Sequence, residues 1–515
     1  MSLAPFKNAP STDWKTEENK AALNRELGKV KEQFSSRYPL IISGEEIYTE
    51  KELTSINPSN HREVIGYVSQ ANQEHIDTAM DAAKKAYGSW SQYTFRQRAL
   101  FLLKLGTIFR KRKMELMAWL IFESGKNAEE AEGEVNEAID FLEMYARHAI
   151  ELEKEAQLVP MDGGENRMIY LPLGVGVIIP PWNFPLAILT GLTVSAAVTG
   201  NAVLLKPSSA TPVTAAKFMQ LIAEAGFPPG VINFVPGPSG EIGDYMVMHK
   251  DVNFISFTGS KEAGLHIDEL SHKRIPGQRW IKRMVGEMGG KGGIVVDETA
   301  DLDAAADGIV ASAFGYQGQK CSAGSRAIIH EEVYGQLVQK ILERTKKLTL
   351  GPSVEGTDLG PVIDEKAFKK ITEYIEIGKQ EADLIWGGKS DKTEGYFIEP
   401  AVFIEASPHS TIMKEEIFGP VLAVCKVSSF EEGIRVYNDT EYGLTGAFYS
   451  RKRDRLDYAS RHMVCGNLFL NSKCTGAVVG VQPFGGYYMS GTGSKIGTLE
   501  FLQNFVQPKT ISEVL

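Results

Sequence analysis

One cysteine lies in a setting that suits a nucleophile. Cys321 follows FGYQGQK, in which Gly315, Gly318 and Gln319 indicate a flexible polar loop between a helix and a strand. Nucleophiles are common in such loops, whereas most free cysteines are buried and inert. The other three cysteines, Cys425, Cys465 and Cys474, lie in apolar or mixed strings and are interpreted as structural. Cys321 is therefore the candidate for covalent chemistry.

Two polar residues could serve a cysteine nucleophile. Glu287 lies in RMVGEMGGKGGIVV, between two apolar segments, and a partly enclosed glutamate has the raised pKa that a general base needs. Asn183 lies in IIPPWNFP, held by prolines at the end of a predicted buried strand, where its amide could stabilise an oxyanion. Each also has an ordinary interpretation, as a solvated loop carboxylate and as a turn asparagine.

A phosphate-binding position is indicated at the end of another strand. Gly259 and Ser260 end the strand NFISFTGS and open a helix that contains Gly264, and a helix N-terminus attracts phosphate. Lys206 ends the strand AVLLK and could meet a ribose or a phosphate. The chain has no G-x-G-x-x-G fingerprint, so a dinucleotide site cannot be inferred from that motif.

Alternating strands and helices must position these residues. Apolar residues at helical spacing predict helices over residues 74–155, and strands then alternate with helices to about residue 470. This alternation predicts an α/β protein with parallel sheets covered on both faces. The expected strands are 174–179, 202–206, 231–236, 253–259, 292–297 and 326–330. The expected helices between them are 185–200, 211–226, 241–249, 301–316 and 332–348. The partly apolar tail, 501–515, is expected to dock on the chain or on a neighbour.

Composition excludes several classes of protein. The 515 residues are 43% hydrophobic and 23% charged, as in an ordinary globular protein of several domains. A net charge of −10 disfavours nucleic-acid binding, and the spacing of cysteines and histidines indicates no metal site. The uncharged run 171–205 is interrupted by four prolines, so a membrane span is not expected. A polar N-terminus and few cysteines favour a cytoplasmic protein.

Seven motifs, taken together, resemble those of the aldehyde dehydrogenase superfamily, in the order of that family and over nearly the whole chain. They are PWNFP at 181–185, KPS at 206–208, FTGS at 257–260, EMGGK at 287–291, FGYQGQKC at 314–321, EEIFGP at 415–420 and PFGG at 483–486. The resemblance implies a Rossmann-like cofactor domain without the usual glycine fingerprint, a catalytic domain and a small oligomerisation element. We expect boundaries at 1–149 with 171–288, at 289–488, and at 150–170 with 489–515.

The resemblance also implies roles for individual residues. Cys321 matches the nucleophile, Glu287 the general base and Asn183 the oxyanion donor. The implied cofactor contacts are Ile179, Pro180, Pro181, Trp182, Lys206, Ser208, Ser209, Gly259, Ser260, Gly264, Glu416 and Phe418. NAD is the expected cofactor. NADP should be tolerated because Ser209 replaces a glutamate that often excludes its 2′-phosphate.

Further strings resemble members of the superfamily that oxidise L-glutamate γ-semialdehyde, formed from 1-pyrroline-5-carboxylate, to L-glutamate. These strings are NEAIDFLEMYAR at 136–147, GQKCSAGSR at 318–326 and TGAVVGVQPFGG at 475–486. The implied substrate contacts are Glu137, Phe184, Ser322, Gly476, Ala477 and Phe484. Two strings depart from the pattern near the expected pocket wall: FLNSKCTGA at 469–477, where an arginine is usual near Ser472, and Tyr487–Tyr488, where an aromatic–lysine pair is common. Another small semialdehyde is the alternative substrate.

Two other classes of function remain as competitors. A cysteine hydrolase would need a histidine partner for Cys321, and His330 is the nearest along the chain. A non-enzymatic protein of the same fold should lack the nucleophile or the base, and both are present. The resemblance also implies a homodimer, or a multiple of dimers, that acts on a small molecule.

Overall fold

Helices dominate the first third of the chain, as predicted. The computed structural model describes residues 3–154, 158–160 and 162–514. The predicted helical region 74–155 forms α2 (Gln73–Trp90), α3 (Phe95–Lys111), α4 (Lys113–Ser124) and α5 (Ala128–Leu152). Asn127 caps α5 by accepting a hydrogen bond from the Glu130 N–H, 3.0 Å away.

The first large sheet has seven strands in the order β11-β10-β7-β8-β9-β2-β3. Its parallel strands are β7 (Val175–Ile179), β8 (Ala202–Leu205), β9 (Ile232–Phe234), β10 (Val252–Thr258) and β11 (Arg283–Glu287). The short strands β2 (Leu40–Ile42) and β3 (Glu45–Ile47) are antiparallel and extend one edge. The chain runs from β7 through β8 to β9 on one side and returns to β10 on the other. Ligands bind in open α/β sheets at such a switch, outside the carboxyl ends of the strands.

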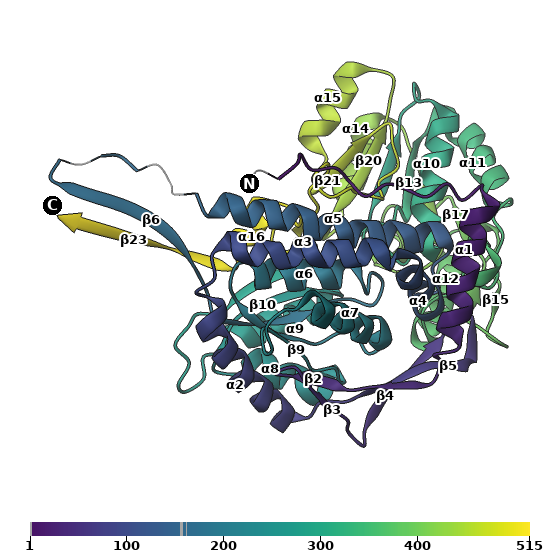
Figure 1. Ribbon diagram of the computed structural model, residues 1–515. Coiled ribbons are helices and arrows are strands. Elements are labelled where there is room, and N and C mark those ends of the chain that lie inside the picture. Colours follow the sequence, from purple (N-terminus) through teal and green to yellow (C-terminus); the bar gives the residue numbers. More distant parts are fainter. Residues whose placement is uncertain (1–2, 155–157, 161, 515) are drawn as a thin grey trace.

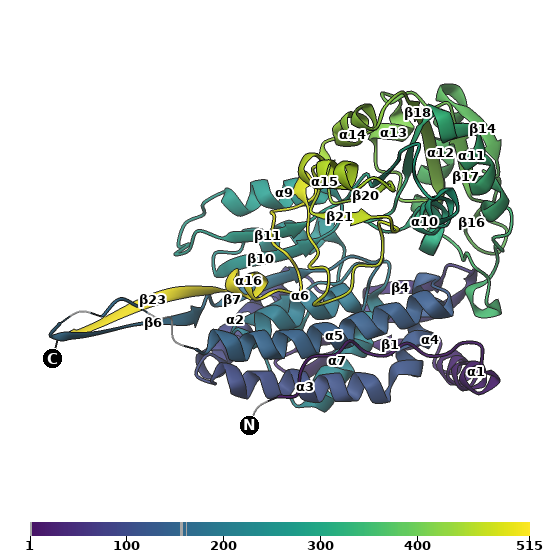
Figure 2. The same ribbon diagram turned by 90° about the horizontal axis from the view of Figure 1, so that it is seen from above.

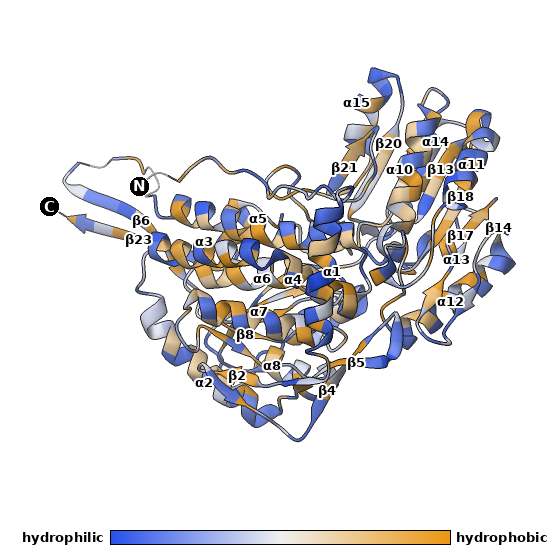
Figure 3. Cartoon of the chain, turned by 45° about the vertical axis from the view of Figure 1, so that its right-hand side comes forward, coloured by the Kyte–Doolittle hydropathy of each residue, from blue (hydrophilic) through white to orange (hydrophobic). Residues whose placement is uncertain are grey.

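Helices cover both faces of this sheet because its strands are apolar on both sides. One face packs against α6 (Ala187–Val198) and α7 (Pro212–Ala225), which are backed by α3 and α5. The other face packs against α2, α8 (Asp244–Met248) and α9 (Lys261–His272). Hydropathy colouring shows this core as orange elements with bluer outer faces (Figure 3). The predicted strands and helices of this region are confirmed.

The second large sheet has the order β14-β17-β18-β13-β12-β20-β21. Its strands are β12 (Gly293–Val296), β13 (Arg326–His330), β14 (Asp383–Trp386), β17 (Ala401–Ile404), β18 (Val421–Val427), β20 (Thr445–Tyr449) and β21 (Asn467–Leu470). All but β14 run parallel. The helices α10 (Leu302–Phe314) and α11 (Glu331–Thr345) cover one face, and α12 (Glu365–Glu381) and α14 (Phe430–Asn438) cover the other. The strands of each large sheet come from one of the two predicted large domains. The exact domain boundaries stay a prediction.

A long two-stranded ribbon extends from the body (Figures 1 and 2). It pairs β6 (Gly164–Pro172) with β23 (Val506–Val514) in antiparallel register, from Val506 opposite Pro172 to Val514 opposite Gly164. The tail therefore docks within the chain, with α16 (Leu499–Gln503) packed on α5. Both strands escaped the sequence analysis. The predicted oligomerisation element, 150–170 with 489–515, falls partly on residues outside the described ranges.

The first 70 residues add structure that the sequence analysis did not predict. The helix α1 (Glu17–Lys31) precedes a small sheet of β1 (Ser36–Tyr38), β4 (Glu52–Asn57) and β5 (Asn60–Ser69). Residues 3–16, here called the N-terminal strap, run along α5 towards α1, where the chain is dark purple in Figures 1 and 2. Within the described ranges, no helix combines the length and the apolar character needed to cross a bilayer.

Candidate active site

A cavity of about 590 Å³ lies between the helix layer and the second sheet. It is lined by both Cys321 and Glu287, and by residues of α5, α6 and the loop after β21. Eight residues singled out from the sequence line it: Glu137, Phe184, Glu287, Cys321, Ser322, Gly476, Ala477 and Phe484. A nucleophile, a carboxylate and candidate anchors therefore share one enclosed space of the size of a small-molecule site.

A tightly held turn positions Cys321. Two non-glycine residues before it, Tyr316 and Gln317, have positive φ angles of 51° and 56°, a conformation that costs free energy and persists only where neighbours enforce it. The Tyr316 hydroxyl donates to the Ser124 carbonyl at 2.9 Å, and the Gln317 amide donates to the Pro361 carbonyl at 2.9 Å. Burial and then the neighbouring Glu287 carboxylate raise the pKa of the Cys321 thiol well above its usual range. The resting residue is therefore a thiol.

Glu287 is the last residue of β11 and lies opposite Thr258 at the end of β10. Burial raises the pKa of Glu287 to about 8, and a hydrogen bond with Cys321 opposes that shift. Its Oε1 atom has no hydrogen-bond partner among the described residues. A carboxyl group of this kind can exchange a proton near neutral pH, as a general base must.

Asn183 is buried beside the nucleophile turn but does not line the cavity. Its Nδ2 atom donates to the Gln319 carbonyl at 3.0 Å, two residues before Cys321. Gln319 is itself fixed, because its Oε1 atom accepts from the Ile363 N–H at 2.9 Å. One of the two Nδ2 hydrogens makes this bond, so the amide keeps a second donor for an oxyanion.

The candidate cofactor residues follow the carboxyl ends of neighbouring parallel strands. Ile179 ends β7 and leads into Pro180, Pro181 and Trp182; Lys206 follows β8; and Gly259 follows β10. Ser208 and Ser209 lie in the loop before α7, and Ser260 caps α9, which contains Gly264. Because β7 lies between β8 and β10, these residues gather around the switch point of the sheet.

Several observations fit a dinucleotide at this edge. Burial lowers the pKa of Lys206 to about 8, and its Nζ atom donates to the Ser239 hydroxyl at 3.0 Å. A phosphate or ribose oxygen would be a natural partner for this sparsely bonded ammonium group. Lys206 and the α9 N-terminus lie on the two sides of β7, which suits the length of a dinucleotide.

Glu416 and Phe418 lie between the two sheets, after α13 (Thr411–Lys414). The Glu416 carboxylate accepts from the Gly290 N–H at 2.8 Å, and burial raises its pKa. A side chain at Gly289 would meet that carboxylate at 2.3 Å, so the glycine permits the contact. Phe418 packs edge-on against Trp182, with 5.4 Å between ring centroids, and so joins the loops from both sheets.

The candidate substrate residues line the same cavity as Cys321. Burial, followed by the nearby Glu134 charge, raises the pKa of Glu137 to about 8. Gly476 has a φ of 80°, which favours glycine, and no acceptor is recorded for the N–H groups of Gly476 and Ala477 within the described part of the chain. A carboxyl group and two available N–H donors can meet the two charged ends of an amino acid.

The sequence analysis missed a buried ion pair below Phe184. The Lys126 ammonium lies 3.0 Å from the Glu134 carboxylate and 3.9 Å and 4.1 Å from the ring centroids of Phe184 and Tyr316. Glu134 also accepts from the N–H groups of Leu186 and Ala187, at the start of α6. The sequence around Lys126 contains no motif that predicts a buried charge. Glu134 could have been recognised, because it lies one helical turn before Glu137 on α5.

Three other sequence features lie outside the cavity. His330 caps α11 and lies 3.8 Å from Glu298, so it gives Cys321 no partner for a hydrolase mechanism. Tyr487 and Tyr488 form β22 and pair with Gly443 and Tyr442; neither lines the cavity, and their place near its wall stays a prediction. Ser472 is exposed and adjoins Lys473, which does line the cavity.

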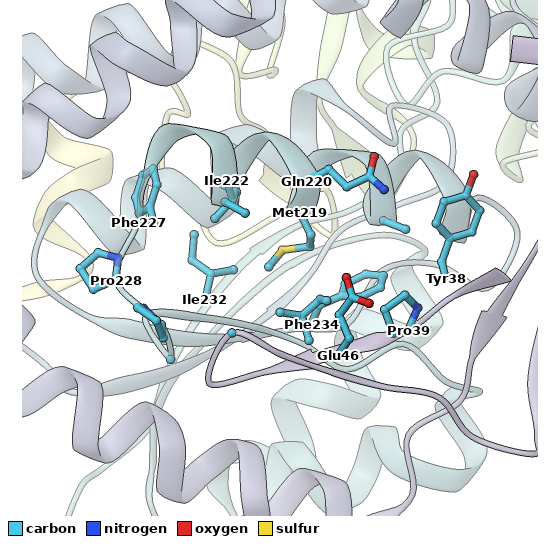
Figure 4. Close-up of a pocket in the computed structure, with 16 residues that line it drawn as sticks. Tyr38, Pro39, Glu46, Met219, Gln220, Ile222, Phe227, Pro228, Ile232 and Phe234 are labelled. Carbon is cyan, nitrogen blue, oxygen red and sulfur yellow. The ribbon is translucent and has the colours of Figure 1, made fainter. Parts of the chain in front are cut away.

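A second cavity, of about 350 Å³, lies between α7 and the strands β2 and β9 (Figure 4). Its walls are largely apolar, with Met219, Ile222, Phe227, Ile232 and Phe234. It holds no nucleophile, and its only charged side chain is Glu46. Covalent chemistry is therefore assigned to the larger cavity. Among the residues with a described position, no group of histidine, cysteine and acidic side chains could hold a metal ion.

Comparisons with known proteins agree on one family. The model of the aldehyde dehydrogenase family matches residues 46–511. A 1-pyrroline-5-carboxylate dehydrogenase from Oceanobacillus iheyensis is 50% identical over 512 residues, covering 99% of both chains. The crystal structure of 1-pyrroline-5-carboxylate dehydrogenase from Thermus with bound NAD superposes with a TM-score of 0.99, at 47% identity and full coverage of both chains. Betaine aldehyde dehydrogenase from Staphylococcus aureus in complex with NAD⁺ gives a TM-score of 0.88, at 29% identity, covering 96% of this chain and 97% of its own.

The raised thiol pKa predicts how Cys321 reacts with an alkylating reagent. With iodoacetamide, labelling should accelerate from about pH 7 to about pH 9.5 without reaching a plateau, because the thiolate is scarce below the raised pKa. Glu287→Gln should label about threefold faster near pH 8.5, since the neighbouring carboxylate opposes the thiolate. Mass spectrometry of the labelled peptide measures both rates, with Cys321→Ala as the background. Slower labelling of Glu287→Gln at that pH would mean that the carboxylate promotes the thiolate instead.

Proposed function

The chain belongs to the aldehyde dehydrogenase family, and from this premise we propose that it oxidises L-glutamate γ-semialdehyde to L-glutamate with NAD. The semialdehyde forms by hydrolysis of 1-pyrroline-5-carboxylate, so the enzyme would complete the breakdown of proline and arginine carbon. One observation carries this choice of substrate: the cavity around Cys321 and Glu287 also contains Glu137 and the Gly476–Ala477 loop.

The cavity suits a short molecule with charge at its far end. The N–H groups of Gly476 and Ala477, together with the Ser322 hydroxyl, can bind an α-carboxylate. Glu137 can accept the α-ammonium group, and Phe184 and Phe484 supply apolar surface for the aliphatic stem. Because Cys321 lines the same cavity, the aldehyde carbon of a semialdehyde held by these anchors would be presented to the thiol.

The first chemical step forms a carbon–sulfur bond. The Cys321 thiol gives up its proton to water, and the thiolate attacks the aldehyde carbon to give a thiohemiacetal alkoxide. The free hydrogen of the Asn183 amide and the Cys321 backbone N–H would donate to that oxygen. One such donor typically lowers the barrier by about 3–4 kcal/mol. A thiol with a raised pKa stays protonated until substrate arrives, which limits side reactions in the resting enzyme.

NAD, when bound, accepts the hydride that leaves the thiohemiacetal carbon. The residues that would hold it are Lys206, Ser260 and Glu416, with Phe418 beside the nicotinamide. A thioester then remains on Cys321. Glu287 takes a proton from water, the hydroxide adds to the thioester carbon, and the thiolate leaves to give the carboxylic acid.

Cofactor choice, assembly and location are part of the same proposal. We infer that NADP is tolerated, since Ser209 carries no charge to repel a 2′-phosphate. We also infer a homodimer or a multiple of dimers, because the β6–β23 ribbon projects from the body and Val159 and Val514 near its end are 87% and 86% exposed. We also infer a cytoplasmic location, because the four cysteines are free thiols and a reducing compartment keeps thiols reduced.

Because Cys321 is the nucleophile and Glu287 activates water, a variant without the Glu287 carboxylate should stall at the thioester. Glu287→Gln should give a burst of reduced cofactor near one equivalent per active site, followed by steady turnover lowered about a hundredfold or more, because water is no longer activated. Stopped-flow absorbance at 340 nm measures the burst. Cys321→Ala, the control, should bind NAD but give no burst. Normal steady turnover by Glu287→Gln would assign the base to another residue.

The loop at residues 475–482 predicts selective loss of the charged substrate. Ala477→Leu should raise the KM for glutamate γ-semialdehyde about tenfold and change the kcat/KM for propanal about twofold or less, because only the former uses the remote anchor. Val481→Leu, in the same loop but outside the cavity, is the matched control. Equal losses on both aldehydes would exclude this anchor, and a wild-type preference for propanal would exclude the substrate.

The exposed Ser209 predicts a change in cofactor preference. Ser209→Glu should lower the kcat/KM for NADP about tenfold or more and change that for NAD by about twofold or less, since the new carboxylate opposes only the 2′-phosphate. Ser209→Ala, which adds no charge, should keep the wild-type ratio. Steady-state assays with NAD and with NADP measure these kcat/KM values. A wild-type preference for NAD by several orders of magnitude would show that a residue other than Ser209 excludes NADP.

A further inference from the structure

The N-terminal strap forms part of the wall of the candidate active site. Three of its residues, Asn8, Ala9 and Ser11, line the cavity that contains Cys321. The strap lies along α5 (Figures 1 and 2). It is held there by two buried carboxylates of that helix, Asp140 and Glu132.

Asn8 joins the two sides of the cavity through one amide group. Its Nδ2 atom donates to the Asp140 carboxylate of α5 at 2.8 Å and to the Val479 carbonyl at 2.9 Å. The second Asp140 oxygen accepts from the Ala9 N–H at 2.7 Å, so the strap binds both oxygens of this carboxylate. The two hydrogens of the Asn8 amide are thus divided between α5 and the loop after β21.

Among the described residues, few other hydrogen bonds join the loop after β21 to the rest of the chain. Gly476 and Val478 are exposed, and the Val478 N–H donates within the loop to the Gln482 side chain at 2.9 Å. Val479 is buried, and a side chain at Gly480 would lie 2.4 Å from Met144 of α5 and 3.1 Å from the strap residue Phe6. The loop therefore rests against both the strap and α5.

Asp140 lies three residues after Glu137 on α5, so both side chains occupy one face of that helix. Asn8 consequently ties the segment that carries Gly476 and Ala477 to the face that carries Glu137. The separation between a carboxylate-binding loop and an ammonium acceptor would be set by this link.

We propose that Asn8 is a positioning residue that determines specificity: it holds the loop of residues 475–480 at the distance from Glu137 that a short α-amino acid requires. The role in specificity rests on the proposed function, whereas the holding of the loop does not. Asn8 does not touch the reacting atoms, so the rate of the chemical steps should not depend on it.

Three variants test the proposal in the full-length protein. Asn8→Ala removes both hydrogen bonds, and Asn8→Asp keeps the shape while replacing the donor by an acceptor that opposes Asp140. Trp14→Phe is the matched control: it removes the hydrogen bond from the Trp14 indole to Glu132, 2.7 Å long, on the same strap but away from the cavity.

Asn8→Ala should raise the KM for glutamate γ-semialdehyde about tenfold, with kcat and the kcat/KM for propanal changed about twofold or less. Asn8→Asp should raise that KM further, and Trp14→Phe should leave all three values near wild type. An unchanged KM, equal losses on both aldehydes, or the same selective rise in Trp14→Phe would overturn the assignment to Asn8.

Amide hydrogen exchange provides a readout independent of the substrate. Peptides from residues 475–482 should exchange about fivefold faster or more in Asn8→Ala, with no change in Trp14→Phe. Unchanged exchange in Asn8→Ala would overturn the proposal. If wild-type enzyme fails to oxidise glutamate γ-semialdehyde, the proposed substrate is wrong, and exchange alone decides whether Asn8 holds the loop.

Discussion

The buried pair of Lys126 and Glu134 connects the parts that make the cavity. Glu134 belongs to α5 and accepts from the first N–H groups of α6, whereas Lys126 contacts the rings of Phe184 and Tyr316. The helix layer, the loop that carries Asn183 and the turn before Cys321 therefore meet at one pair of charges. Removing one member of such a pair leaves an unpaired buried charge, which commonly costs about 3–5 kcal/mol. The cavity wall depends on both charges being present.

Burial acts in the same direction on three ionisable groups of the cavity. Burial is the largest cause of the raised pKa values of Glu137, Glu287 and Cys321, and all three are shifted towards the neutral form. The other charged residues of the lining include Lys320 and Glu130, which pair with each other at 2.8 Å. A carboxyl with a pKa of about 8 changes protonation state easily when an ammonium group or a proton donor approaches, which suits both binding and catalysis.

The sequence predicted the parts of the molecule that follow local patterns. The β7–β10 strands and the helices between them follow from periodicity, and the residues at the strand ends follow from the parallel arrangement. Contacts between distant segments have no such pattern. Asn8 and Asp140 are 132 positions apart, and no local pattern around Asn8 indicates a contact with α5. The β6 strand was missed for the same reason, since its partner lies at the end of the chain.

The pairing of β6 with β23 also has a consequence for synthesis on the ribosome. Residues 164–172 emerge more than 300 residues before their partners, 506–514. Translation at about 5–20 residues per second leaves β6 without its partner for tens of seconds. The first sheet also lacks contacts during this time, because the carbonyl of buried Phe505 accepts hydrogen bonds from Leu173 and Asn201. The nascent chain thus carries an open strand edge and an incomplete core until residues 506–514 leave the exit tunnel, and a chaperone could protect that edge during this interval.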